Sequence, residues 1–427
     1  MLIQFKFNNI YSFYKEQTFS MVSAPLRASK SQYSNMLSAA KNLPPLLLSS
    51  VVYGANASGK SNFVKTIDFF LTFINESSLS KPETIILVPP FLLNTNSKNE
   101  ASSFEIIFVK AEVIYRYGFE LNSKEIRKEW LYVKTERESL VFQREGESIN
   151  VNSKYKISRD LAKKKMIRKN ALLLSVAAQF NEPIAITMFE WFQSFFRISG
   201  FNDSVFRNYT QNLLKNDIEK LKILSLLKNA DLGIEDILLK EQEGQSFSFT
   251  FQLGSQENVK EERQKTILQN LITVKNIYNK AGEMSGQIEM NFDAQESEGT
   301  QKLFHLSGLF FYLLENGGVM LIDEFDAKLH PLLTIELITI INNPAINIYG
   351  AQLIFTTHNT NLLAAKIFRR DQVWFTEKNR MGESLMFSLY DFKQRNDSDI
   401  EKNYTNGRFG AIPYLNNLKE TFQNSEN

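Results

Sequence analysis

Along the first 150 residues, apolar and polar positions alternate in the way that is typical of strands buried on one face. Residues 2–7 follow this pattern, and residues 17–23 resume it after the turn signal Asn8-Asn9, which predicts a hairpin. Three later runs of the same kind predict a meander packed against the rest of this region: residues 104–110, 113–121 and 129–135.

Beyond residue 150 the apolar positions change to helical spacing and later return to strands. The expected elements, in order, are helices at 159–181, 187–197 and 205–229, a strand at 247–253, strands around a turn at Gly282 and Gly286, a helix at 303–315, and buried strands at 319–322 and 352–355. The order predicts an α/β protein with mixed sheets.

We expect three stretches of chain with different character. Residues 1–150 form an N-terminal lobe, residues 151–285 a mainly helical insertion or arm, and residues 286–427 a C-terminal lobe that completes the first. A chain of 427 residues is long enough for two or three domains.

The amino-acid composition mainly excludes certain kinds of site and partner. The chain has no cysteine, which excludes disulfides and cysteine-based zinc sites and fits a reducing compartment. The net charge of +2 favours neither an acidic nor a basic partner, so only a local patch could do so. We see no signal peptide and no apolar run of membrane-spanning length, so a cytoplasmic location without a membrane partner is expected.

The most informative stretch reads VVYGANASGKSN, from Val51 to Asn62. It places Gly54-x-x-x-x-Gly59-Lys60-Ser61 between a buried strand and a helix over residues 63–74, which is the context of a phosphate-binding loop. The backbone N–H groups and the helix N-terminus would hold phosphates. Lys60 would reach the β- and γ-phosphates of ATP, and Ser61 would ligate Mg²⁺. Asn56 and Asn62 belong to the same predicted binding segment.

Two later strands each end in polar residues that suit the other half of such a site. The strand at 319–322 is followed by Asp323 and Glu324, which are expected to hold Mg²⁺ and to act as general base for the attacking water. The strand at 352–355 delivers Thr356-Thr357-His358, and His358 is expected to contact the γ-phosphate or the water. His330 and His305 are weaker candidates for this contact.

A further anion-binding candidate precedes the helix at 303–315. Ser297 and Gly299 lie in the sequence Glu296-Ser297-Glu298-Gly299-Thr300, where a Ser and a Gly at a helix N-terminus can bind an anion. The alternative is that Ser297 or Thr300 simply caps the helix.

The series of motifs resembles the ATP-binding head of the ABC class, in the branch of the RecF and SMC proteins. It is similar in more detail to bacterial abortive-infection ATPases, which include the RloA-type proteins and the ATPase subunit of PARIS-type anti-phage systems. The matching segments are Asn9-x-x-Ser12-Phe13, Ala230-Asp231-x-Gly233-Ile234, Ser297-x-Gly299-Thr300, Asp323-Glu324-x-Asp326-x-x-Leu329-His330-Pro331 and Gly407-Arg408-Phe409-Gly410-Ala411-x-Pro413.

The resemblance implies a P-loop NTPase head of ABC type that binds ATP and Mg²⁺. In that group Ser297 and Gly299 of one subunit would close on the γ-phosphate held by another, so a homo-oligomer is expected. Slow ATP hydrolysis would control an effector, a nuclease or toxin. This effector is expected to be a separate protein, because only 69 residues follow His358 and they lack a nuclease pattern. Within them, Asp397-Ser398-Asp399 is interpreted as surface. The resemblance also implies a lid residue, and the loop at 91–96 is the candidate position for it.

Two other functions remain open at this point. A DNA-repair or recombination ATPase would engage DNA through the insertion, and the basic cluster Lys163–Lys169 (KKKMIRK) could contact a phosphate backbone. A solvated helix face explains that cluster equally well. The second possibility is a passive scaffold in which ATP has only a structural role.

Overall fold

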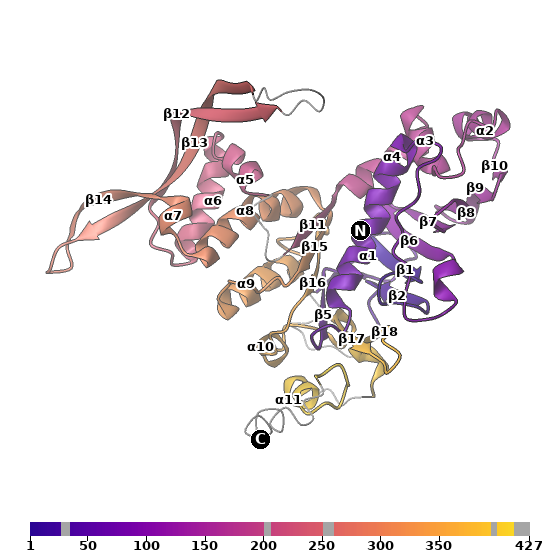
Figure 1. The fold of residues 1–427 in the computed structure, drawn as a ribbon. Coiled ribbons are helices and arrows are strands. Elements are labelled where there is room, and N and C mark those ends of the chain that lie inside the picture. Colours follow the sequence, from indigo (N-terminus) through magenta and orange to yellow (C-terminus); the bar gives the residue numbers. More distant parts are fainter. Residues whose placement is uncertain (27–34, 200–205, 251–259, 394–398, 414–427) are drawn as a thin grey trace, which may run out of the picture. The chain divides into compact units, whose positions relative to one another are not determined.

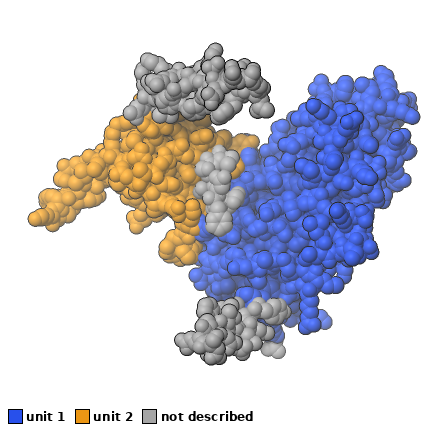
Figure 2. All heavy atoms as spheres, viewed as in Figure 1, with its two compact units in different colours: residues 1–201, 313–327, 334–427 blue, residues 202–312, 328–333 orange. Residues whose placement is uncertain are grey.

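The computed structural model describes residues 1–26, 35–199, 206–250, 260–393 and 399–413 (Figure 1). The chain divides into two compact units (Figure 2). Unit 1 comprises Met1–Phe201, Leu313–Ala327 and Thr334–Asn427, and unit 2 comprises Asn202–Tyr312 and Lys328–Leu333. Asp397 and Ser398 lie outside the described residues, and Asp399 caps a short helix, α11 (Ile400–Thr405).

The first sheet of unit 1 is antiparallel and has seven strands in the order β10-β9-β8-β7-β6-β1-β2. The predicted hairpin and meander are both confirmed, and two additional strands extend the sheet beyond the meander. The strands are β1 (Leu2–Asn8), β2 (Gln17–Ser20), β6 (Ser102–Lys110), β7 (Val113–Leu121), β8 (Ile126–Lys134), β9 (Glu138–Glu145) and β10 (Ser148–Val151).

The second sheet of unit 1 has six strands in the order β11-β15-β16-β5-β17-β18. The first five are parallel and β18 pairs antiparallel with β17. Their parallel arrangement brings the carboxyl ends of β5, β15 and β16 to one edge of the sheet. The strands are β5 (Ser49–Gly54), β11 (Phe195–Ser199), β15 (Val319–Asp323), β16 (Gln352–Thr356), β17 (Val373–Lys378) and β18 (Ser384–Ser388).

Helix α1 (Lys60–Glu76) supplies the core that joins the two sheets of unit 1. Phe70 stacks on Phe119 of the first sheet at 5.3 Å between ring centroids and meets Phe5 edge-on at 5.4 Å. Val52 and Leu321 of the second sheet belong to the same buried cluster. Fully buried aromatic side chains remove large apolar areas from water, so the many phenylalanines fix this layer arrangement.

The boundaries of the units differ from those expected at residues 151 and 286. Residues 151–201 belong to unit 1, because their helices bury apolar side chains against its first sheet. The ring of Trp191 stacks on Phe108 at 3.9 Å, and buried Glu129 accepts hydrogen bonds from the backbone N–H groups of Leu173 and Leu174. The helices are α2 (Lys156–Lys163), α3 (Leu173–Gln179) and α4 (Pro183–Gln193).

Unit 2 mixes strands and helices, so the expectation of a mainly helical insertion needs correction. Its three-stranded antiparallel sheet has the order β12-β13-β14, and a tight turn at Gly282 (φ +81°) joins the last two strands. Charged residues such as Lys240, Glu241 and Glu243 interrupt the apolar pattern of the first of these strands in the sequence. The elements are α5 (Arg207–Leu213), α6 (Asp217–Asn229), β12 (Asp236–Thr250), β13 (Lys260–Tyr278), β14 (Met284–Asn291), α7 (Phe292–Gln295) and α8 (Glu298–Asn316).

Short elements complete the described chain: β3 (Met36–Leu37), β4 (Leu46–Leu47), α9 (Pro331–Asn342), α10 (Asn361–Ala364) and α11. The predicted mixed α/β fold, with a Gly-rich loop between a buried strand and a helix, is thereby confirmed. Among the described residues, no helix combines the length and the apolar character needed to cross a bilayer.

Candidate functional site

The Gly-rich loop leaves the carboxyl end of β5 and enters α1 at Lys60. Gly59 has a φ of +122°, and a Cβ there would lie 2.6 Å from the Ser384 hydroxyl oxygen, so only glycine fits. Ala57 also has a left-handed φ of +60°. The loop therefore curls in the manner of a phosphate-binding loop, with exposed Asn56 at its outer turn and Ser61 in the first turn of α1.

Lys60 lies along the inside of this loop. Its ammonium donates hydrogen bonds to the carbonyl oxygens of Gly54 at 2.8 Å and Ala55 at 3.1 Å, and its side chain is buried. Burial lowers the pKa of Lys60 to about 8, although the charges of Asp323 and Glu324 oppose that shift. Among the described residues the ammonium forms no ion pair, so a bound anion would supply the missing negative charge.

A network of hydroxyl groups from β17, β18 and the N-terminal motif supports the Gly-rich loop. The Ser384 hydroxyl oxygen on β18 lies 2.6 Å from the carbonyl oxygen of Ser58 and 2.7 Å from the hydroxyl of Ser12. Ser58 in turn shares a 2.7 Å hydrogen bond with Thr376 of β17. The side chain of Asn62 donates to Ser12 at 2.8 Å, so Asn62 anchors the N-terminal Asn-x-x-Ser-Phe motif.

Asp323 and Glu324 stand at the end of β15, and β16 separates this strand from β5. Thr356, at the end of β16, donates a hydrogen bond from its hydroxyl to Asp323 Oδ1 at 2.6 Å. The same hydroxyl oxygen accepts from the backbone N–H of Glu324 at 2.8 Å. Glu324 has a left-handed φ of +56°, a conformation that a glutamate holds only when its surroundings enforce it.

His358 follows β16, which pairs with the Asp323 strand as the sequence led us to expect. Removal of water around the ring, followed by the charge of Lys60, lowers the pKa of His358, whereas Asp326 and Asp323 act in the opposite direction. Asp323 acts on the pKa of both Lys60 and His358, and Lys60 acts on that of His358, so these three side chains lie within reach of one another's charge.

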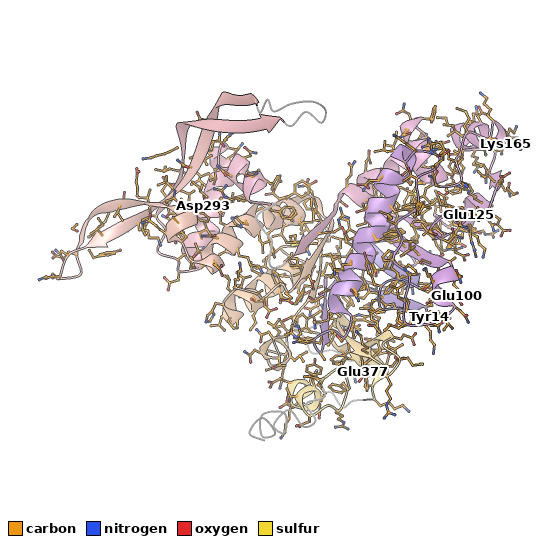
Figure 3. All side chains as sticks on the ribbon, in the orientation of Figure 1. Tyr14, Glu100, Glu125, Lys165, Asp293 and Glu377 are labelled. Carbon is orange, nitrogen blue, oxygen red and sulfur yellow. The ribbon has the colours of Figure 1, made fainter. Side chains whose placement is uncertain are left out.

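A C-terminal segment packs beside this edge of the second sheet. The hydroxyl of Tyr53, which precedes Gly54, donates to the carbonyl oxygen of Asn359 at 3.0 Å, and its ring contacts that of Tyr404 in α11. Glu377 lies on β17 and is labelled in Figure 3. Its carboxylate accepts from the backbone N–H of Ala411 at 3.3 Å. The Gly-Arg-Phe-Gly-Ala motif is thus tied to β17, and the Tyr404 hydroxyl donates to the carbonyl oxygen of Ala411 at 3.1 Å.

Ser297 and Gly299 lie in unit 2, at the start of α8. The Ser297 hydroxyl accepts from the backbone N–H of Thr300 at 3.2 Å, so it caps the helix. A Cβ on Gly299 would lie 2.6 Å from the carbonyl oxygen of Lys328, which explains the glycine. Ser297 remains exposed, so capping leaves it accessible to a partner.

The remaining candidates are less directly connected. The 91–96 loop is tied to the N-terminal motif, since Asn9 accepts from the backbone N–H of Phe91 at 3.2 Å and donates to the carbonyl oxygen of Ser97 at 2.8 Å. Its role as a lid stays a prediction. His305 is buried in unit 2, and the Nδ1 of His330 accepts from the backbone N–H of Leu332 at 3.3 Å.

Comparison with models of known protein families identifies the family of this chain. A family model described as "AAA domain, putative AbiEii toxin, Type IV TA system" matches residues 49–364, from the strand that precedes the Gly-rich loop to beyond His358.

The chain belongs to this family.

Solved structures similar to this AAA-domain chain include "SMC head domain from Thermotoga maritima", with a TM-score of 0.40 and 11% identity over 91% of this chain and 98% of that one. Another is a structure of "the SmcHead bound to the C-winged helix domain of ScpA", with a TM-score of 0.40 and 12% identity over 91% of this chain and 97% of the other. No curated protein matches the chain.

Sequence patterns alone did not single out the supporting residues of this AAA-domain site. Thr356 stands two residues before His358, so its position at a strand end was a usable signal. Ser384 and Thr376 lie more than 300 residues from the Gly-rich loop, and no local pattern links them to it.

Proposed function

We propose that this chain binds ATP with Mg²⁺ and slowly hydrolyses it to ADP and phosphate, as the ATPase subunit of a cytoplasmic anti-phage defence complex. Two copies would assemble head to head around ATP, and this assembly would control a separate effector protein, a nuclease or toxin. The family description, which refers to AbiEii and to a type IV toxin–antitoxin system, supports the role in defence.

The observation that carries the ATPase proposal is the unneutralised Lys60 ammonium inside a curled Gly-rich loop. Its two hydrogen bonds go to the carbonyl oxygens of Gly54 and Ala55, and the charges of Asp323 and Glu324 only raise its pKa. A triphosphate would bring the anionic oxygens that this arrangement lacks. Backbone N–H groups at the start of α1 would add their partial positive charge.

The oxygen ligands of Ser61 and Asp323 suit Mg²⁺, which prefers hard oxygen donors and keeps several waters. Thr356 occupies Oδ1 of Asp323, so the other carboxylate oxygen is the one free to face the metal or its water shell. When bound, Mg²⁺ would neutralise charge on the phosphates. Among the described residues no group of three or more His, Asp or Glu side chains is arranged to hold a metal ion.

Glu324 is assigned the role of general base, and His358 that of a contact to the γ-phosphate or attacking water. The hydrogen bond from the Glu324 backbone to Thr356 fixes the position of the glutamate relative to Asp323. The lowered pKa of His358 favours the neutral imidazole, which can donate from one nitrogen and accept at the other and is thus suited to orient the water.

Ser297 and Gly299 of a second copy are proposed to complete the site. Ser297 stands at the N-terminus of α8, a helix of 19 residues, where backbone N–H groups and the helix dipole favour an anion. Because Ser297 is exposed, a phosphate held by another copy can reach its hydroxyl and the first backbone N–H groups of the helix.

The test uses Glu324→Gln, which preserves shape and removes the base. With ATP and Mg²⁺, this variant should elute as a larger, stable assembly on a sizing column with light scattering, and it should retain bound ATP. The double variant Lys60→Ala/Glu324→Gln should not assemble. If Glu324→Gln binds ATP but keeps the same mass as the protein without nucleotide, the assembly proposal fails while the ATP site stands.

A further inference from the structure

The most uneven charge distribution in the described chain lies outside the nucleotide site, in residues 152–170. Eight of these 19 residues are Lys or Arg and only Asp160 is acidic, although the whole chain has a net charge of only +2. The exposed basic side chains, hereafter the α2 basic surface, are Lys154, Lys156, Arg159, Lys163, Lys164, Lys165 and Lys169.

This surface is held rigidly on unit 1. Leu161 is buried in its core, and Ser158 donates hydrogen bonds from its backbone N–H and its hydroxyl to Glu182 at 2.9 and 3.1 Å. The carbonyl oxygen of Lys169 accepts from the backbone N–H of Ile126 at 2.8 Å. The backbone positions of the basic residues are therefore set before any ligand arrives, and only their side chains would lose freedom on binding.

None of the seven basic side chains forms an ion pair with another described residue, whereas all three lysines of α6 do. On α2, Lys156, Arg159 and Lys163 follow the spacing i, i+3, i+7 and so share one face. That row is about 10 Å long at 1.5 Å per residue, which spans about three phosphates of one strand of duplex DNA.

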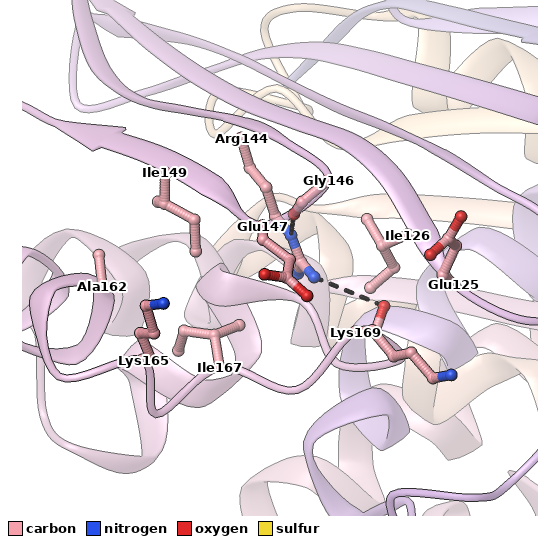
Figure 4. A pocket seen from close by; sticks show the side chains of 10 residues that line it. All are labelled: Glu125, Ile126, Arg144, Gly146, Glu147, Ile149, Ala162, Lys165, Ile167 and Lys169. Atoms are coloured by element: carbon pink, nitrogen blue, oxygen red, sulfur yellow. Dashed lines mark hydrogen bonds between the residues drawn. The ribbon is translucent and has the colours of Figure 1, made fainter.

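The neighbouring cavity of about 240 Å³ is not the anion site (Figure 4). Arg144 at its wall directs its guanidinium to backbone carbonyl oxygens, those of Gly146 at 2.9 Å and Ala171 at 2.8 Å, and Glu125 and Glu147 also line the cavity. The unpaired positive charge is on the outer row of α2 and on the turn that follows it.

We infer that the α2 basic surface binds double-stranded nucleic acid through its phosphates, independently of base sequence. A row of a single sign of charge fits a uniformly charged polymer better than a protein surface, where both signs alternate. Tyr155, the one aromatic residue of the stretch, is half-buried, so the stacking platform typical of single-strand binding is missing from these described residues. Met166, at 50% exposure, is their one exposed large apolar side chain.

The inference is independent of the proposed ATPase role. The test measures binding of a labelled DNA duplex of about 30 base pairs, roughly three helical turns, between about 50 and 200 mM salt. The 427-residue chain should bind with an affinity that falls steeply with salt. The variant Lys156→Glu/Arg159→Glu/Lys163→Glu should bind at least about 10-fold more weakly, with a salt slope shallower by about 3.

Two controls make the result decisive. The variant Lys41→Glu/Lys98→Glu/Lys378→Glu has the same change in charge at exposed positions outside the surface, and its affinity should fall less than about threefold. Replacing the α2 residues by Gln guards against misfolding and should give an intermediate loss. The inference is overturned if the two charge-reversed variants bind alike, if no salt-dependent binding occurs, or if poly-glutamate competes as well as duplex DNA at equal charge.

Discussion

The hydroxyl of Thr356 bridges the two carboxylate residues at the end of β15, because it donates to Asp323 Oδ1 at 2.6 Å and accepts from the backbone N–H of Glu324 at 2.8 Å. Thr356 is fully buried at the end of the neighbouring strand β16. One side chain thus fixes both the proposed metal-binding carboxylate and the proposed base.

Thr356→Val keeps the shape of the side chain and removes this bridge. We expect the Mg²⁺ concentration for half-maximal ATPase activity to rise and kcat to fall by about 10- to 100-fold, because residues that orient metal ligands typically contribute this much. Thr356→Ser should restore most of the activity. A Val variant with unchanged Mg²⁺ dependence would contradict the positioning role.

The pKa of Lys60, lowered to about 8, predicts pH-dependent ATP binding. Below pH 8 the ammonium is charged and binds phosphate. Above pH 8 the free protein loses this proton, so ATP affinity should fall by up to about tenfold per pH unit. Calorimetry from pH 7 to 9.5 measures this dependence.

Glu324→Gln provides a matched test of the same coupling. The charge of Glu324 raises the pKa of Lys60, so its removal should move the loss of ATP affinity to lower pH. An identical pH dependence in the two proteins would show that Glu324 does not influence Lys60.

The hydroxyl network behind the Gly-rich loop gives a third prediction. Ser384→Ala removes contacts with Ser58 and Ser12 without touching the proposed phosphate site. We expect ATP affinity to fall by about 5- to 10-fold, which corresponds to about 1 kcal/mol for a lost hydrogen bond. Ser388→Ala, on the same strand, is the control. Equal losses of ATP affinity in the two variants would count against a specific link between the hydroxyl network and the Gly-rich loop.

The sequence predicted best those features that depend on residues close together in the chain. The Gly-rich loop, the Asp323-Glu324 strand end and the hairpin and meander of the first sheet all depend on neighbouring residues, and the structure has them as expected. The roles of Ser384 and Thr376 depend on strands that meet only after folding, so no pattern near Gly59 could have identified them.

The extent of the units was the least predictable feature. Helical spacing beyond residue 150 indicated a separate insertion, yet the apolar faces of α3 and α4 pack on the first sheet of unit 1. Glu129 is the anchor: it accepts from Leu173, Leu174 and the Tyr117 hydroxyl, and lies 4.0 Å from Arg144. A glutamate within a strand gives no sign of such a role.

Glu129 gives a fourth prediction, on stability. Glu129→Ala leaves Arg144 buried without its counter-ion and α3 without its acceptor, so the free energy of unfolding should fall by about 3 kcal/mol or more. Glu120→Ala, on the adjacent strand, breaks a partly exposed pair with Lys128 and should cost less than about 1 kcal/mol. Urea unfolding measures both. Similar losses would show that the buried carboxylate is not an anchor.

The central claim, that ATP is shared between two copies, is tested most directly by mixing two inactive variants. Lys60→Ala removes the phosphate contact of one copy, whereas Ser297→Asp retains a helix-capping oxygen but repels the γ-phosphate. Ser297→Asn is the uncharged control and should keep more activity than Ser297→Asp. Each inactive variant alone should lack ATPase activity, and their mixture should regain it, because one of the two shared sites then has both functional residues. A mixture no more active than its two components would contradict the claim.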